Sequence, residues 1–172
     1  KESQAAPIAA FAALVAQKTN RPARLILSKD DDMIMTGKRN PFENSYQVGF
    51  NKNGEIKVLD VMLYSNGGAY ADLSTSIMER AMLHIDNAYY IENLRVRGHV
   101  CRLHQHPHTA FRGFGGPKGV ATIEKIIEQI SFYLKSQGID LDPLEIRKIN
   151  CYDSKNGRDI TPYGQKVENN CL

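Results

Sequence analysis

Four glycines within seven positions, Gly113, Gly115, Gly116 and Gly119, constrain the fold of this chain more than any other feature. Phe114, Pro117 and Lys118 interrupt the run, and Phe111 and Arg112 precede it. Such a segment is neither a strand nor a helix. Glycine allows positive φ and lets another group approach the main chain, because no Cβ stands in the way. We therefore expect a loop whose N–H groups point at an anion or another ligand, leading into a helix N-terminus that also attracts negative charge.

The helix that follows is predicted from Pro117 to Gln137, with Gly138 ending it. Its apolar residues are spaced by three and four positions, as one face of a helix requires. They are Val120, Ile123, Ile126, Ile127, Ile130 and Leu134. The same pattern predicts a helix from Ser74 to Leu83, and Asp142-Pro143 is typical of the start of a shorter helix that ends near Asn150.

Alternating segments predict strands on either side of these helices. Residues 46–50 and 55–64 form two antiparallel strands joined by a turn that ends in Asn53-Gly54. The second strand runs toward Gly67 and Gly68, which we expect to bend it or to mark close approach of another backbone. A further strand over residues 93–103 leads into the glycine-rich loop.

The N-terminal region is more apolar. Residues 5–16 have no polar face over three turns, which predicts a helix buried on every side, with Ser3 as its cap. This helix is too short to cross a bilayer. The aliphatic residues 24–28 predict a buried strand, and Ser28 before three aspartates predicts a capped, solvated helix start. The absence of an initiator Met indicates a fragment of a larger assembly.

Length and composition favour one ordinary globular domain. A chain of 172 residues buries roughly two thirds of its extended surface. We predict an α+β domain over residues 1–152, an antiparallel sheet with helices packed against it, and a loop or linker over residues 153–172. Three widely separated cysteines indicate reduced thiols in a cytoplasmic protein.

Several classes of function do not fit the sequence. The net charge of +3 is spread along the chain, which argues against nucleic-acid binding, and no segment argues for a membrane. Lys118 stands where a dinucleotide-binding motif needs its third glycine, and no Gly-Lys-Ser/Thr of a P-loop is present. His104, His106 and His108 could form a zinc site, but Pro107 interrupts the segment, so solvent-facing or hydrogen-bonded histidines are favoured.

At Thr109–Pro117 the sequence Thr-Ala-Phe-Arg-Gly-Phe-Gly-Gly-Pro resembles the molybdenum-cofactor loop of the xanthine dehydrogenase and aldehyde oxidase family of molybdenum hydroxylases. The resemblance extends to residues 76–81, to residues 86–89 and to Lys1-Glu2-Ser3. It implies a molybdopterin cofactor-binding domain. In that family other residues, often Asn, stand at the position of His108.

The resemblance also implies roles for individual residues. Ala110, Phe111, Arg112 and Gly113 would bind the cofactor, with the main-chain amide of Arg112 facing molybdenum. The substrate-binding residues would be Glu2, Arg80 and Phe114, the last stacked on a planar ring. From composition alone Arg80 is expected to form a surface salt bridge. The resemblance implies instead that it points into the substrate pocket. No residue of the chain matches the family's catalytic glutamate.

The implied activity is that of a purine hydroxylase, which converts hypoxanthine to xanthine and then urate, with the isolated fragment inactive. The complete enzyme would also use 2Fe-2S clusters, FAD and NAD, bound outside this chain on other segments, domains or subunits. Two alternatives remain: a hydroxylase of the same family acting on aldehydes or other N-heterocycles, and a non-catalytic binding or assembly module.

Overall fold

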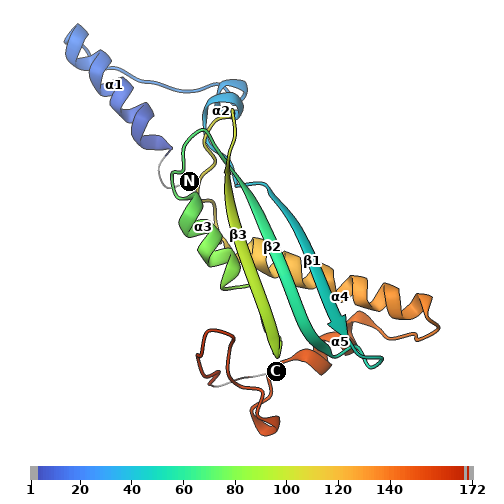
Figure 1. Cartoon of the computed structure of the whole chain (residues 1–172). Helices are drawn as coiled ribbons and strands as arrows, with labels where there is room; N and C mark the ends of the chain where they lie inside the picture. The colour runs from blue at the N-terminus through green and yellow to red at the C-terminus, as the bar shows by residue number, and fades with distance from the viewer. Residues whose placement is uncertain (1–3, 169, 171–172) are drawn as a thin grey trace.

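The fold is a three-stranded sheet with helices on one face (Figure 1). The computed structural model describes residues 4–168 and 170. In chain order the elements are α1 (Ala5–Thr19), α2 (Lys29–Met35), β1 (Phe42–Phe50), β2 (Ile56–Gly68), α3 (Ser74–Met82), β3 (Asn93–Arg102), α4 (Gly116–Ser136), α5 (Pro143–Asn150) and the 3-10 turn η1 (Ser154–Asn156).

The sheet has the order β1-β2-β3. The predicted hairpin is confirmed, since β1 and β2 are antiparallel and Gly54 ends their turn with a φ of 82°. β3 instead runs parallel to β2, because α3 carries the chain back across the sheet between them. The α+β class with helices packed on a sheet is therefore confirmed, while the sheet is mixed rather than wholly antiparallel.

The core lies between the sheet and helices α3 and α4. Alternate residues of β2, Leu59, Val61 and Leu63, are fully buried on the helix side. The predicted stripe of α4 meets them, and its four isoleucines, Ile123, Ile126, Ile127 and Ile130, are also fully buried. Burial of one such side chain stabilises a fold by roughly 1.5–3 kcal/mol. This two-layer core fixes the start of α4, and hence the glycine-rich loop, relative to α3.

The opposite face of the sheet is polar. Asp60 of β2 lies between Arg95 and Arg97 of β3 and forms ion pairs with both. The hydrogen bond from Arg95 is the main reason that the pKa of Asp60 is lowered. Next to this cluster, Tyr64 stacks on His99 with ring centroids 5.2 Å apart. The sheet thus buries one face only.

Asn150, at the end of α5, connects that helix to the β1–β2 hairpin. Its side chain is 1% exposed and its amide nitrogen donates to the carbonyls of Gly54 (2.9 Å) and Ile146 (2.8 Å). Its Oδ1 accepts the N–H of Ile56 at 2.8 Å. One buried amide therefore satisfies three main-chain groups.

Substitution of Asn150 by leucine is expected to lower the free energy of unfolding by about 3–5 kcal/mol, because three buried polar groups lose their partner. Urea unfolding followed by circular dichroism measures the change. Asn53→Ala, in the exposed turn of the same hairpin, is the matched control and should change it by less than about 0.5 kcal/mol. Equal urea midpoints for the two variants would contradict this role of Asn150.

The N-terminal segments project from one end of the sheet (Figure 1). α1 is helical as predicted, but no residue of it is buried by the part of the chain that the structure describes, and Phe11 is 57% exposed. The predicted strand over residues 24–28 is wrong: this segment is a mostly exposed connection that pairs with no strand among the residues described. Ser28 does cap α2, where its Oγ accepts the N–H of Asp31 at 3.1 Å. The predicted Ser3 cap lies outside the described residues.

The C-terminal region after α5 is mostly irregular, apart from η1 and short bridges. Near its start, the hydroxyl of Tyr152 donates to buried Asp86 at 2.6 Å. Cys101 and Cys151 are free thiols. Among the residues described, no helix has the length and apolar character needed to span a membrane.

Candidate functional site

The glycine-rich loop, residues 109–116, is held at its entrance by strand-like pairing. Thr109 donates its N–H to the carbonyl of Lys38 at 2.9 Å and forms a parallel bridge with Arg39. Just before it, His106 crosses Gly68 so closely that a Cβ on Gly68 would lie 2.2 Å from the His106 carbonyl. The expected close approach at Gly68 is thus confirmed. Ala110 is fully buried, which anchors the loop where its exposed part begins.

The loop then makes two consecutive tight turns. The N–H of Phe114 donates to the carbonyl of Phe111 (2.8 Å), and the N–H of Gly116 donates to that of Gly113 (3.0 Å). Gly113 and Phe114 both have positive φ, at 88° and 55°. Successive residues of this kind turn neighbouring N–H groups toward one side, in a concave arrangement that binds anions. Within the described residues, the N–H groups of Arg112 and Gly113 donate to no other atom.

Arg39 holds the first half of the loop. Its Nη2 donates to the carbonyl of Arg112 at 2.8 Å, and its guanidinium lies 4.6 Å from the centroid of the Phe111 ring. The Arg112 carbonyl oxygen therefore points toward Arg39 and not toward the side of the loop where the free N–H groups lie. A guanidinium on an aromatic face adds a further attraction of about 0.5–1 kcal/mol.

Lys118 holds the second half. Its side chain is 8% exposed, and its Nζ donates to the carbonyl of Phe114 at 2.5 Å. Burial, together with the positive charge of Arg39, lowers the pKa of Lys118 to about 8. The hydrogen bond supports Phe114 in its left-handed conformation, which is uncommon for a residue other than glycine.

Two of the four glycines serve helix packing. A Cβ on Gly115 would lie 2.0 Å from the carbonyl oxygen of Ile77, and one on Gly119 would lie 2.3 Å from that of Ala81. The start of α4 therefore contacts the main chain of α3 directly. This corrects the expectation that these two glycines let a ligand approach. Gly113, with its positive φ, lies in the exposed part of the loop and makes no such contact with α3.

The residues that the resemblance assigned to the substrate lie around this contact. Arg80 is in the last turn of α3, with an exposed side chain and a main-chain carbon 3.0 Å from the Cβ position of Gly115. Phe114, half-buried, precedes that glycine. Arg80 and Phe114 therefore come from adjacent segments. Glu2 lies outside the described residues.

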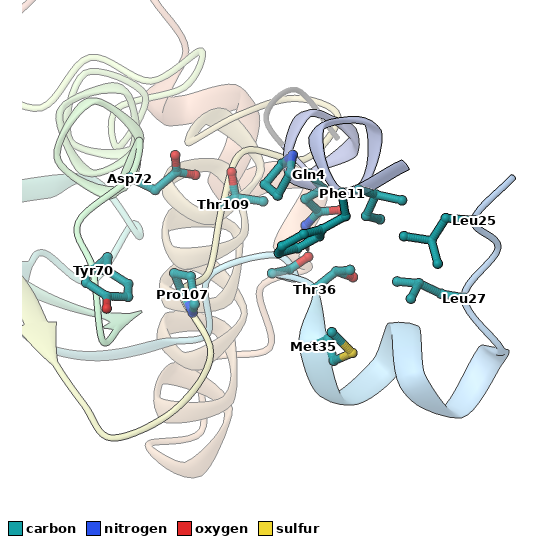
Figure 2. A pocket seen from close by; sticks show the side chains of 13 residues that line it. Gln4, Phe11, Leu25, Leu27, Met35, Thr36, Tyr70, Asp72, Pro107 and Thr109 are labelled. Carbon is teal, nitrogen blue, oxygen red and sulfur yellow. Dashed lines mark hydrogen bonds between the residues drawn. The ribbon is translucent and has the colours of Figure 1, made fainter. Parts of the chain in front are cut away.

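A mainly apolar cavity of about 430 Å³ adjoins the entrance of the loop (Figure 2). Phe11 of α1, Leu25 and Leu27 of the α1–α2 connection, and Met35 of α2 lie on one side of it. Pro107, Thr109, Tyr70 and Asp72 lie on the other, with Gln4 at the start of α1. Gln4 also donates to the carbonyl of Gly37. Sequence patterns did not predict this cavity, because they placed α1 in a closed core.

The three histidines before the loop do not form a metal centre. Within the residues that the structure describes, no group of three or more His, Cys, Asp or Glu side chains could hold a metal ion. His104 is exposed, whereas His108 is 5% exposed and packs edge-on against His106 with ring centroids 4.9 Å apart.

The buried position of His108 makes stability depend on pH. Burial, and then the nearby His106, lower the pKa of His108. As the pH falls below about 6.5, the unfolded chain takes up a proton before the folded chain does, so the free energy of unfolding decreases down to the folded pKa. We expect His108→Gln to flatten that decrease, by up to about 1.4 kcal/mol per pH unit. Urea unfolding between pH 7 and pH 5 tests it, with exposed His104→Gln as control; the same slope in both variants would contradict it.

Two residues of this site, Arg39 and Lys118, did not stand out in the sequence. Lys118 carried a usable signal, because a lysine in the first turn of a helix opposes the helix dipole and calls for a local partner. Arg39 carried none, since the loop residues that it contacts lie 70 or more positions away in sequence.

Comparison with known proteins identifies the fold. Residues 1–151 match the model of the molybdopterin cofactor-binding domain. Over 168 residues the chain is 44% identical to the xanthine dehydrogenase/oxidase of Gallus gallus and 41% identical to the nicotinate hydroxylase of Emericella nidulans, covering 98% of the chain and 12% of each relative. The crystal structure of the aldehyde oxidoreductase from Desulfovibrio desulfuricans superposes with a TM-score of 0.78 and 26% identity, over 91% of this chain and 16% of that one.

These matches agree with one another. The chain spans about an eighth of the length of the curated relatives, and the match covers nearly all of the chain. The chain therefore belongs to the molybdopterin cofactor-binding domain family and is similar throughout to molybdenum hydroxylases of the xanthine dehydrogenase and aldehyde oxidase type.

Proposed function

We propose that this chain is part of the molybdenum-binding portion of a purine hydroxylase, which oxidises hypoxanthine to xanthine and xanthine to urate. The observation that carries the proposal is the 109–116 loop, where the N–H groups of Arg112 and Gly113 are free while the carbonyls of Arg112 and Phe114 are held by cations. All five carbonyls of residues 111–115 accept hydrogen bonds, so this stretch presents donors, which suits a negatively charged ligand.

The residues present fit a molybdenum cofactor. The Arg112 amide would face the metal centre, and Gly113 keeps that approach open because it has no Cβ. Buried Ala110 and half-exposed Phe111 would form the adjoining wall. When bound, the cofactor supplies two-electron oxidation and oxygen insertion at a carbon of the substrate.

The chain's own residues would bind and polarise the substrate. Arg80 would stabilise the negative charge that develops on a purine ring during hydroxylation, which favours the transition state over the ground state. Phe114 would stack on the ring and fix its plane. Glu2 would hydrogen-bond the heterocycle and set its orientation. The proximity of the Arg80 main chain to Gly115, next to Phe114, supports this arrangement.

The rest of the catalytic machinery would lie outside this chain. We propose that the full-length protein also carries 2Fe-2S clusters and FAD, reduces NAD, serves purine catabolism in the cytoplasm and supplies the catalytic base. The domain would end near residue 152, with residues 153–172 linking it to the next segment. The 172-residue chain by itself would be inactive.

Metal analysis of the full-length protein tests the proposal. We expect about one molybdenum per polypeptide by inductively coupled plasma mass spectrometry, and loss of most of it in a Gly113→Val variant, because a β-branched side chain is strained at a φ of 88°. Gly157→Ala, in the exposed turn after η1, is the control. Absence of molybdenum from the full-length protein would exclude an enzyme of this kind and favour a non-catalytic module.

A second candidate is a hydroxylase of the same family that prefers an aldehyde or another N-heterocycle. It is supported by the 41% identity to a nicotinate hydroxylase, close to the 44% identity to a xanthine dehydrogenase/oxidase. Steady-state kinetics on the full-length enzyme separate the two. We expect kcat/KM for hypoxanthine to exceed that for nicotinate and for a small aromatic aldehyde; the reverse order would overturn the roles given to Glu2 and Arg80.

A further inference from the structure

Two cationic side chains donate hydrogen bonds to carbonyl oxygens of the 109–116 loop. Arg39 comes from the segment before β1 and bonds the carbonyl of Arg112 at 2.8 Å, while Lys118 comes from the first turn of α4 and bonds that of Phe114 at 2.5 Å. The two carbonyls are two residues apart and flank Gly113. The N–H groups of Arg112 and Gly113, on the same short stretch, are among those of the loop that donate to no acceptor within the described residues.

Two contacts offset the unfavourable position of Lys118: its hydrogen bond to the Phe114 carbonyl, and the ring of Phe42, whose centroid lies 5.9 Å from the Lys118 Nζ. A buried ammonium group is costly unless it is paired, and the start of a helix is the positive end of its dipole. Within the described residues, no carboxylate forms an ion pair with either Arg39 or Lys118, and the cavity of about 370 Å³ that both line contains Lys125 but no acidic residue. The carbonyl of Phe114 is therefore the main compensation for burying Lys118.

The two hydrogen bonds set the direction in which the peptide groups of the loop point. A carbonyl that turned toward the donor side would repel an anion there, and each peptide unit that turns its oxygen one way turns its N–H the other. Holding the oxygens of residues 112 and 114 fixes the peptide planes that follow them, including the N–H of Gly113. It also keeps Phe114 at its positive φ.

We propose that Arg39 and Lys118 are positioning residues that hold the 109–116 loop in its donor-only conformation, so that the Gly113 amide is aligned, beside that of Arg112, before an anionic metal cofactor binds. This inference rests on the proposed function for the identity of the ligand. The alignment itself is a property of the chain and can be measured without the cofactor. Neither residue touches the reacting atoms, so neither is catalytic.

Hydrogen exchange of the cofactor-free, full-length protein tests the alignment. The readout is the exchange of the Phe114 and Gly116 amides, which close the two turns of the loop. We expect Lys118→Met, which removes the donor, to speed their exchange by on the order of tenfold. Lys118→Gln keeps a donor without the charge, so it should stay within about threefold of the parent. The matched control is Lys125→Met, an exposed residue of the same cavity and helix that pairs only with Glu128.

The same variants in the molybdenum-loaded protein test the consequence. Lys118→Met and Arg39→Gln should release molybdenum about tenfold faster and alter the electron paramagnetic resonance signal of the reduced metal, whereas Lys118→Gln and Arg39→Lys should restore both. These conservative variants also cover the case in which Lys118→Met does not fold. Parent-like exchange at Phe114 and Gly116 in both Lys118→Met and Arg39→Gln would overturn the inference. If the parent protein contained no molybdenum, the proposed function would be overturned instead. The hydrogen-exchange rates would still test whether Arg39 and Lys118 hold the loop in this conformation.

Discussion

Replacement of Gly115 by alanine is expected to lower the free energy of unfolding by more than about 4 kcal/mol, the range reached only by severe steric or packing defects. Its Cβ would lie 2.0 Å from the Ile77 carbonyl oxygen and 2.5 Å from the Ala81 nitrogen, both in the main chain of α3. A helix backbone cannot move away as a flexible side chain could. Gly115 has a φ of −82°, which alanine adopts readily, so the effect is purely steric.

The neighbouring glycine provides the control for that substitution. A Cβ on Gly116 would meet only the His84 ring, at 3.5 Å, which is an ordinary contact. Since Gly116 lies in the first turn of α4, Gly116→Ala should be neutral or stabilise the chain by up to about 1 kcal/mol. Urea unfolding of the two variants compares them directly. Similar urea midpoints for Gly115→Ala and Gly116→Ala would show that the packing of α3 on α4 does not depend on this close approach.

Substitution of Arg80 by methionine in the full-length enzyme is expected to reduce kcat/KM for hypoxanthine by roughly 10²–10³-fold, as the loss of one charge-stabilising donor does elsewhere. Methionine keeps most of the length of the side chain and removes the positive charge that would face the purine ring. Activity on a small aldehyde should fall by less than about tenfold, because little charge spreads onto such a substrate. Steady-state kinetics with both substrates measure the ratio.

The control for Arg80 is Arg95→Met, on the polar face of the sheet away from the helices. Arg95 pairs with Asp60, and Arg97 keeps that carboxylate paired when Arg95 is removed. Its activity on both substrates should match the parent. If Arg80→Met lowered both activities equally, Arg80 would be a structural residue of α3 and the substrate role would be lost.

Local signals in the sequence predicted much of the fold. The Asn-Gly turn predicted the β1–β2 hairpin, the spacing of isoleucines predicted the buried face of α4, and Ser28 and Asp142 predicted two helix starts. Each of these signals acts within a few residues. The direction of β3 was missed because it depends on the path of the whole chain through α3, which no local pattern encodes.

Long-range packing explains the other differences. Residues 24–28 have the composition of a buried strand but pair with no strand among the described residues, and α1 has an apolar surface that those residues leave exposed. For the site, the motif at Thr109–Pro117 indicated the loop correctly. It did not indicate that Gly115 and Gly119 serve contact with α3, or that Arg39 and Lys118 hold the carbonyls, since these contacts join segments distant in sequence.

The central claim is that the free amides of this loop face an anionic molybdenum centre. A crystal structure of the full-length protein with its cofactor bound tests it most directly, through the distance from the Arg112 nitrogen to the nearest atom bound to the metal. The account predicts a hydrogen-bond distance of about 2.7–3.2 Å, with the carbonyls of Arg112 and Phe114 still on Arg39 and Lys118. A bound cofactor that leaves the Arg112 amide facing solvent or another protein group would contradict it.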